Sequence, residues 1–553
     1  MNSRPSTVAD AFAHAAEHSV RNFGQKPFLC VLPETAAVYD VPAGEITYAE
    51  ALMRIERLRV VYAAAGYGHG HRVGLLLENR PAFFMHWFAL NGVGASVVPI
   101  NPDLRSAELE YLIGHSEIAL AIALPSHHDA LRAAARSAGR EMHVIGADDS
   151  PPAAPFAAPY GGAPIGERSE CALLYTSGTT GRPKGCMLPN RYFLHAGAWY
   201  AGIGGLARLH AGAERMLTPL PLVHMNAMAY STMAMVMTGG CLIALDRFHP
   251  STWWDSVRES RATVVHYLGV MPAMLMKAAP AAQDRQHRVR FGFGAGVDRS
   301  LHAPFEERFG FPLLEAWAMT ETGAGAVVIA HNEPRRIGTS CFGREGSDVE
   351  VSIVSESGAP AGVDEPGELL VRHAGADARD GFFSGYLKDE AATDEAWAGG
   401  WFHTGDIVRR GADGQLHFID RRKNVIRRSG ENISAVEVES VLLQHPRVKA
   451  AAVAAVPDAV RGDEVLACIV GAGAPASDGP ASDDARRALA ADIVDWCLAR
   501  LAYYKAPGYV AFIDALPLTA SQKVQRGELR TLAASLVGQP HCVATGALKK
   551  RPS

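Results

Sequence analysis

The sequence has no marked excess of charge of one sign, no CxxC cysteine pair and no N-terminal pattern typical of a secretory signal. Lysine and arginine number 53 against 58 aspartates and glutamates, a formal net charge of −5, which offers no general attraction to nucleic acid or to anionic membranes. The eight cysteines form no CxxC motif, so we expect reduced core residues rather than disulfides or zinc ligands. No long apolar run follows the basic residue near the N-terminus, as a secretory signal requires. These absences favour a cytoplasmic protein that binds no nucleic acid.

Long apolar runs are also rare, and the best candidate for a membrane span is 227–245. The run has about the right length for a span, but serine and threonine residues and the pair Gly239–Gly240 interrupt it. Paired glycines are typical of a turn, so we expect a buried helix followed by a buried strand over 241–245. We therefore expect no integral membrane segment.

The chain has 553 residues, too many for one hydrophobic core, so more than one domain is expected. A capping box over 47–50 and apolar residues at helical spacing predict a helix that stops at Gly66. Short apolar strands such as 73–77 alternate with helical stretches, which is typical of parallel α/β layers. From about residue 345, strand-like runs become frequent and indicate a β-rich subdomain.

A second unit is predicted to begin near Asp420. Ser434 and Glu437 form the ends of another capping box pattern, and strand-like runs follow at 450–456 and 464–470. This α+β unit of about 130 residues has an ordinary domain size. The predicted fold class is therefore α/β: a large N-terminal domain over 1–420, a hinge at 421–423 and a small mobile α+β domain over 424–553.

The strongest chemical signal is the loop from Thr176 to Gly185, which follows a short apolar strand. It reads Thr-Ser-Gly-Thr-Thr-Gly-Arg-Pro-Lys-Gly. Glycines let backbone N–H groups approach a ligand, hydroxyl groups donate hydrogen bonds and lysine supplies a charge, so the loop suits a polyphosphate. It is not a Walker A loop, because the G-x-x-x-x-G-K-[ST] spacing is absent. The alternative is a flexible Ser/Gly surface loop.

This loop resembles the signature loop of the adenylate-forming superfamily, which contains acyl-CoA synthetases, stand-alone adenylation domains and firefly-type luciferases. The resemblance continues in order over most of the chain. It implies that the loop holds ATP through Thr176, Ser177, Gly178, Thr179, Thr180 and Lys184.

Three further motifs match the family in the middle of the chain. His224, in Pro-Leu-Pro-Leu-Val-His, matches a position beside the acyl pocket and the ATP site, and 294–296 (Gly294, Ala295, Gly296) resembles the turn against adenine. In Trp-Ala-Met-Thr-Glu, the resemblance implies that Thr320 contacts the α-phosphate, Glu321 holds Mg²⁺ and Trp317 stacks on adenine. Trp317 and Ala318 replace the family's usual tyrosine and glycine, so Ala318 could narrow the acyl pocket.

The C-terminal motifs match as well. The resemblance implies that Asp406 and Arg421 bind the ribose, Lys423 is the pivot of the hinge and Gly430 lets pantetheine pass. Lys523 matches the catalytic lysine that bridges the carboxylate and the α-phosphate. Two departures are Asn424 in place of a common acidic residue and Gln522 in place of glycine.

The function that the resemblance implies is a two-step ligase using ATP, Mg²⁺ and coenzyme A. A carboxylic acid and MgATP give an acyl-adenylate and pyrophosphate, and a thiol then displaces AMP while the small domain rotates. The nearest-looking branch is the carnitine/crotonobetaine-CoA ligases, on stretches such as 284–288 and 305–310. The pocket candidates are mostly small or apolar and predict a small or medium organic acid: Met225, Asn226, Tyr230, Gly269, Met271 and Ala318. A homodimer is left open.

Three alternatives share these motifs. A stand-alone adenylation enzyme would load the thiol of a carrier protein, and a luciferase-like oxygenase would emit light or consume oxygen. A non-catalytic ATP-binding protein is the alternative from another class, given Gln522 and Ala318.

Overall fold

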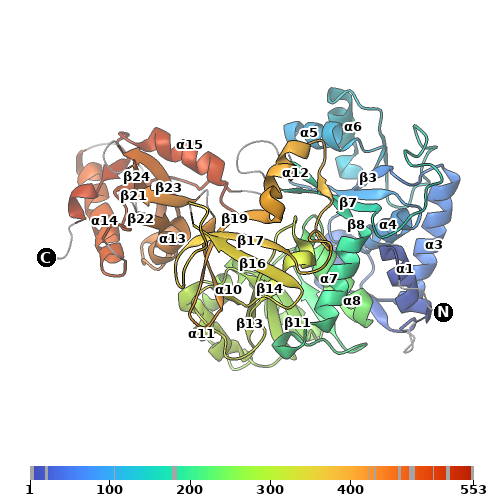
Figure 1. Cartoon of the computed structure of the whole chain (residues 1–553), viewed down its shortest axis with the longest axis horizontal. Helices are drawn as coiled ribbons and strands as arrows, with labels where there is room; N and C mark the ends of the chain where they lie inside the picture. The colour runs from blue at the N-terminus through green and yellow to red at the C-terminus, as the bar shows by residue number, and fades with distance from the viewer. Residues whose placement is uncertain are drawn as a thin grey trace.

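A computed structural model of the 553-residue chain gives the architecture (Figure 1). The structure describes residues 5–18, 23–104, 106–176, 183–355, 357–421, 424–428, 431–458, 462–471, 480–501, 503–518 and 523–549.

Two sheets of mainly parallel strands form the large part of the molecule, as the alternation of strands and helices predicts. Within the described ranges, one sheet has eight strands and the other has seven. In sheet order, the first contains β14 (Val328–Ile329), β13 (Leu313–Trp317), β12 (Phe291–Ala295), β11 (Val264–Leu268), β9 (Arg215–Thr218), β10 (Cys241–Ala244), β1 (Pro27–Val31) and β2 (Gly44–Thr47). The second contains β18 (Gly385–Tyr386), β8 (Lys184–Pro189), β7 (Glu170–Thr176), β4 (Ser96–Pro99), β3 (Arg72–Leu76), β5 (Leu120–Ala123) and β6 (His143–Ile145).

Helices cover these sheets and share one large apolar core with them. The helix predicted after the first capping box is α3 (Tyr48–Ala64), and Thr47 and Glu50 bond each other's backbone N–H as predicted. Helix α4 (Pro81–Gly92) is buried on every side from Phe83 to Asn91, as expected for a helix that is apolar all round. The other helices of this part are α1 (Val8–Ala13), α2 (Pro33–Tyr39), α5 (Ser106–Ser116), α6 (His128–Ser137), α7 (Asn190–Gly202), α9 (Trp253–Glu259), α10 (Val270–Met276), α11 (Arg299–Phe309) and α12 (Glu390–Ala396).

The apolar stretch 227–245 is a buried helix, a turn and a buried strand, as predicted. It begins as a π-helix, η4 (Asn226–Thr232), continues as α8 (Met233–Thr238) and reverses at Gly239, whose φ is 63°, before β10. The sequence did not predict the π-helical geometry, a form that often occurs at functional sites. Among the residues that the structure describes, no helix has the length and apolar character needed to cross a bilayer.

The β-rich subdomain expected after residue 345 is a five-stranded antiparallel sheet. It lies near the centre of the molecule, between the two ends of the chain (Figure 1). Its strands, in sheet order, are β15 (Cys341–Gly343), β20 (Leu416–Arg421), β19 (Phe402–Arg410), β17 (Gly367–His373) and β16 (Val349–Val354).

The C-terminal part, coloured orange to red in Figure 1, is an α+β unit with apolar clusters of its own. Its strands are β21 (Val425–Arg428), β22 (Glu431–Ser434), β23 (Val448–Asp458), β24 (Gly462–Gly471), β25 (Tyr509–Phe512) and β26 (Cys542–Ala544). Its helices are α13 (Ala435–Leu443), α14 (Pro480–Leu498) and α15 (Arg526–Leu536). The boundary at residue 420 stays a prediction, and Lys423 lies outside the described residues.

Only one half of the second predicted capping box forms. Ser434 Oγ accepts from the N–H of Glu437 at 3.2 Å, as a cap should. The Glu437 carboxylate instead pairs with Lys505 Nζ at 2.8 Å, because a charged partner from the same unit offers a stronger bond than a backbone N–H. The Ser434 hydroxyl also donates to Asp420 Oδ2 at 3.0 Å, which ties α13 to the end of β20.

Candidate functional site

The candidate site lies at the carboxyl ends of the parallel strands β9, β11, β12 and β13. These strands pair in parallel register, so the loops that follow them meet at one edge of the sheet, the usual place for a ligand in α/β folds. That edge collects the segments that contain His224, Gly269, Gly296 and Glu321. The sequence predicted His224, Gly296 and Glu321 from separate motifs and Gly269 as a pocket candidate, and the sheet order brings their segments together.

The phosphate loop joins the last residue of β7 to the first residue of β8. Thr176 and Lys184 face each other across this antiparallel pair. Lys184 Nζ lies 4.7 Å from the centroid of the Tyr386 ring and 3.8 Å from Asp389 Oδ2. The predicted ligands Ser177, Gly178, Thr179 and Thr180 lie outside the described residues.

Glu321 lies beside this loop, and Tyr386 joins the two. The Tyr386 hydroxyl donates to Glu321 Oε1 at 2.9 Å, and the glutamate side chain is only 7% exposed. Strand β18, which contains Tyr386, pairs with β8 directly after Lys184. Sequence reasoning missed Tyr386, because it stands 65 residues beyond Glu321 and no local spacing links them.

Glu321 suits a magnesium ion that arrives with a nucleotide. Mg²⁺ takes one or two carboxylates together with phosphate oxygens and water, rather than a cage of protein ligands. The tyrosine hydrogen bond holds Oε1 and orients the carboxylate beside the phosphate loop. In the described part of the chain, no group of three or more His, Cys, Asp or Glu side chains is placed to hold a metal.

Asp406 is a buried carboxylate with one satisfied oxygen. Trp317 Nε1–H donates to Asp406 Oδ2 at 2.9 Å, whereas the buried Oδ1 makes no hydrogen bond with any residue that the structure describes. Arg421 Nε lies 3.3 Å from Oδ1 as an ion-pair partner without hydrogen-bond geometry. Burial raises the pKa of Asp406, and the charge of Arg421 and the Trp317 hydrogen bond offset part of that rise. An acceptor held in this state fits a ligand hydroxyl.

Lys523, from the C-terminal unit, reaches the same edge. Lys523 is exposed to solvent, but neighbouring protein atoms remove part of its hydration. This loss of hydration and the charge of Arg421 lower the pKa of Lys523. Desolvation by the surrounding protein lowers the pKa of His224 to about 4, and the positive charge of Lys523 contributes to that decrease. The structure thus places Lys523 within electrostatic reach of both Arg421 and His224. The predicted Gly430 and the departure Gln522 lie outside the described residues.

The buried side chain of Glu315 holds the turn at 294–296 through backbone hydrogen bonds. Glu315 accepts hydrogen bonds from the N–H groups of Gly296 and Val297 at 2.9 and 3.0 Å, and from the Tyr267 hydroxyl at 3.1 Å. Burial raises the pKa of Glu315, and the bonds from Val297 and Gly296 offset part of the effect. Sequence reasoning did not single out Glu315, because a glutamate within a strand carries no motif.

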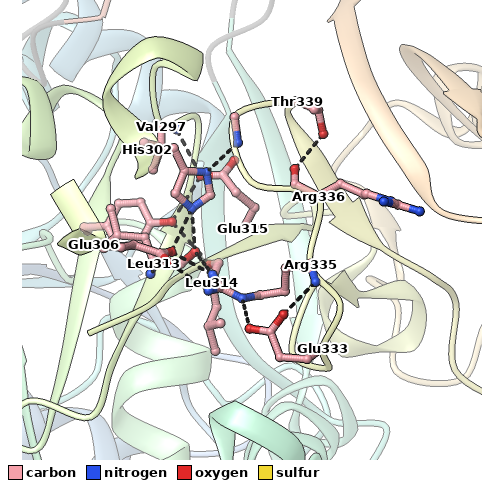
Figure 2. A network of polar contacts seen from close by, with 12 residues as sticks. Val297, His302, Glu306, Leu313, Leu314, Glu315, Glu333, Arg335, Arg336 and Thr339 are labelled. Carbon is pink, nitrogen blue, oxygen red and sulfur yellow. Dashed lines mark hydrogen bonds and ion pairs between the residues drawn. The ribbon is translucent and has the colours of Figure 1, made fainter. Parts of the chain in front are cut away.

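Figure 2 shows the polar network that anchors this part of the site. Arg335 pairs with both oxygens of Glu306 at 2.7 and 2.8 Å, and His302 Nε2 contacts Glu306 and the carbonyl of Leu313 at 3.1 Å each. Burial alone would raise the pKa of Glu306, but the bonds from Arg335 and His302 bring it to about 2. The network fastens α11 and the segment around Arg335 to the start of β13, the strand that ends at Trp317.

The predicted acid-pocket residues divide into core and rim positions. Tyr230 and Met271 are buried, and the Tyr230 hydroxyl donates to the carbonyl of Gly323 at 2.9 Å. Asn226 is half-buried, and its Oδ1 lies 2.6 Å from Nδ1 of the fully buried His266. Since Oδ1 has no hydrogen, Nδ1 carries the proton and Nε2 accepts from Tyr200, 3.1 Å away. Met225 and Ala318 are also half-buried.

Gly269→Ala should destabilise the site edge. A Cβ at Gly269 would lie 1.7 Å from the carbonyl oxygen of Gly296, a backbone atom that cannot rotate away. We expect a loss of about 1–3 kcal/mol, as for other overpacked positions, and a lower thermal midpoint. Gly202→Ala is the matched control, because a Cβ there meets no atom within 4 Å. Equal midpoints for the two variants would contradict the close approach.

Together, the parallel sheets, the phosphate loop and the collected charged side chains define an α/β enzyme of the adenylate-forming class. Comparison with known proteins identifies the family. The model of the AMP-binding enzyme family matches residues 19–387, and that of the AMP-binding enzyme C-terminal domain matches residues 437–523. The chain belongs to the AMP-binding enzyme family. The adenylate-forming ligase expected from the signature loop is thereby confirmed.

Individual relatives cover nearly the whole chain. A feruloyl-CoA synthase from Amycolatopsis sp is 33% identical over 498 residues, 88% of this chain and 93% of the relative. A crotonobetaine/carnitine–CoA ligase from Shigella flexneri is 27% identical over 521 residues, 90% and 96% of the two chains. The o-succinylbenzoate CoA synthetase from Bacillus subtilis, solved with its acyl-adenylate intermediate, superposes with a TM-score of 0.76 at 24% identity and covers 94% of this chain and 97% of its own. The likeness to crotonobetaine/carnitine ligases agrees with the branch that the sequence suggested.

Proposed function

We propose that this protein is an ATP-dependent carboxylic acid–CoA ligase that forms an acyl-adenylate and then an acyl-CoA. The observation that carries the proposal is the meeting of Lys523 with His224 and Arg421 beside Asp406. Arg421, which acts on Lys523, also pairs with Asp406, whose Oδ1 makes no hydrogen bond with the residues that the structure describes. The named relatives catalyse, by their names, CoA thioester formation from organic acids.

In the first step, a carboxylate oxygen of the acid attacks the α-phosphorus of ATP and the P–O bond to the β-phosphate breaks. Pyrophosphate leaves with the electron pair, and no protein nucleophile is needed. Lys523 would offset the negative charge that crowds between carboxylate and phosphate, and Thr320 would contact the α-phosphate. Bound Mg²⁺, held by Glu321 and phosphate oxygens, would neutralise phosphate charge.

In the second step, the CoA thiol gives its proton to solvent and the thiolate attacks the acyl carbon. The bond from that carbon to the phosphate oxygen breaks, and AMP leaves with the electron pair. We propose that Lys423 is the pivot, that the unit after it rotates, and that Gly430 lines the thiol's path. One contact would have to break in such a rotation: Ser440 Oγ, on α13, donates to Asp298 Oδ2 at 2.6 Å. Asp298 also caps α11 in the large part of the molecule.

The remaining nucleotide-binding and acid-binding residues belong to the same proposal. The phosphate loop with Lys184 would hold the β- and γ-phosphates, the 294–296 turn and Trp317 would contact adenine, and Asp406 with Arg421 would bind the ribose. A small or medium acid would lie between η4 and the ends of β11 and β13, beside Asn226 and Ala318. A cytoplasmic location belongs to the same proposal. A homodimer stays an open hypothesis that sedimentation equilibrium can decide.

The test is a panel of carboxylic acids incubated with ATP, Mg²⁺ and CoA. The panel should contain aromatic acids such as ferulate and small trimethylammonium acids such as crotonobetaine, because those are the acids in the relatives' names. We expect acid-dependent pyrophosphate release and a CoA thioester detected by mass spectrometry. A carrier protein in place of CoA tests the adenylation-domain alternative. ATP binding without acid-dependent pyrophosphate release for any acid would refute the proposal.

A further inference from the structure

We propose that Trp317 is a positioning residue for the nucleotide ribose: its indole N–H holds one oxygen of Asp406, so that the other oxygen receives a ribose hydroxyl. The inference rests on the proposed function, in which Asp406 binds ATP. It assigns to Trp317 a task beyond the adenine stacking expected of an aromatic residue at this place.

The contact is short and shielded from water. Trp317 Nε1 lies 2.9 Å from Asp406 Oδ2, and the two residues are 6% and 3% exposed. Trp317 is the last residue of β13 in the eight-stranded sheet, whereas Asp406 lies within β19 of the antiparallel sheet. The bond therefore joins two sheets at the point where the ligand edge meets the β-rich subdomain.

The chemistry of the two groups gives the bond a direction. An indole nitrogen donates and cannot accept, and a carboxylate accepts only. Oδ2 is therefore occupied, whereas the buried Oδ1 makes no hydrogen bond within the described part of the chain. The Asp406 N–H is itself engaged with Thr404 Oγ1 at 3.0 Å. A buried acceptor without a hydrogen bond is costly unless a ligand supplies the donor, and a ribose hydroxyl is such a donor.

The same bond helps to keep the carboxylate ionised. Burial raises the pKa of Asp406, and the charge of Arg421, together with the indole bond, opposes that rise. Arg421 is more than half exposed, so solvent screens its charge. The indole is buried and is not screened in this way. Without the N–H, we expect Asp406 to bind a proton at higher pH.

Trp317→Phe tests the proposal, because phenylalanine keeps an aromatic face and removes the N–H. We expect ATP affinity, measured by isothermal titration, to fall roughly 10-fold, as for loss of a hydrogen bond to a charged group. The preference for ATP over 2′-deoxy-ATP and 3′-deoxy-ATP should shrink for at least one of the two analogues. In turnover, KM for ATP should rise more than kcat falls, and the acidic limb of kcat/KM should move to higher pH.

Trp87→Phe is the matched control, since Trp87 is a fully buried tryptophan whose Nε1–H donates to Cys171 Sγ at 3.3 Å. It removes a buried indole N–H elsewhere and should leave ATP affinity and deoxy-ATP discrimination unchanged. Should Trp317→Phe fold poorly, Trp317→Tyr keeps the ring and a polar hydrogen, and partial rescue of ribose discrimination is expected.

A double-mutant cycle with Asp406→Ala separates positioning from stacking. If Trp317 acts through Asp406, adding Trp317→Phe to Asp406→Ala should change ATP affinity by less than twofold. Independent, additive losses would overturn the proposal, as would a Trp317→Phe variant with wild-type affinity and wild-type discrimination. ATP affinity is measured without acid or CoA, so this outcome is distinct from failure of the proposed ligase activity, which acid-dependent pyrophosphate release reports.

Discussion

Lys523→Ala should lower acid-dependent pyrophosphate release about 1,000-fold, the upper range for removing one group that stabilises a developing charge. The expected cause is the loss of positive charge where a carboxylate approaches the α-phosphate. The position of Lys523 supports this role, since its charge lowers the pKa of His224 and the charge of Arg421 lowers the pKa of Lys523. ATP affinity should change little, because the phosphate loop and Asp406 lie in the other part of the molecule. Pyrophosphate release and isothermal titration with ATP are the two measurements.

The second half-reaction separates a catalytic role of Lys523 from damage to the fold. Supplied with synthetic acyl-adenylate and CoA, Lys523→Ala should form thioester at close to the wild-type rate, because the lysine is expected to leave the site before the thiol attacks. Lys449→Ala is the control, an exposed lysine on the same C-terminal unit, and it should behave as wild type in both steps. Normal adenylation by Lys523→Ala would show that another group carries the charge.

Glu321→Gln should lower kcat/KM for ATP about 100-fold at low magnesium concentration. Glutamine has nearly the same size but no negative charge, and a neutral amide oxygen is a weaker ligand than a carboxylate for a hard cation. The apparent magnesium constant should therefore rise, and excess Mg²⁺ should restore part of the activity. A magnesium titration at fixed ATP measures both effects.

Tyr386→Phe probes the same site through the residue that orients the carboxylate. It removes the hydroxyl that donates to Glu321 Oε1 but leaves the charge, so we expect a smaller loss, about 10-fold, from one hydrogen bond to a charged group. Glu395→Gln, an exposed carboxylate on α12, is the control and should have no effect. A Glu321→Gln enzyme with unchanged magnesium dependence would remove Glu321 from the metal site.

Local elements were predictable wherever neighbouring residues decide the geometry. The Thr47–Glu50 capping box predicted the start of α3, and the glycine pair after residue 238 predicted the reversal into β10. The second capping box was only half right, because Lys505 competes for the Glu437 carboxylate. A competing partner 68 residues away leaves no trace in a four-residue pattern.

The amino-acid sequence by itself determined the family, the order of the motifs and the residue types that can meet a nucleotide. Glycines, hydroxyl groups and single charged residues at particular places in the chain carry that information directly. Tertiary structure alone decided which of these groups touch: Trp317 and Asp406 are 89 residues apart, and Glu321, in the turn after β13, meets Tyr386 of β18. Such contacts depend on sheet order and on burial, because these bring side chains that are distant in the sequence together and exclude the water that would otherwise satisfy them.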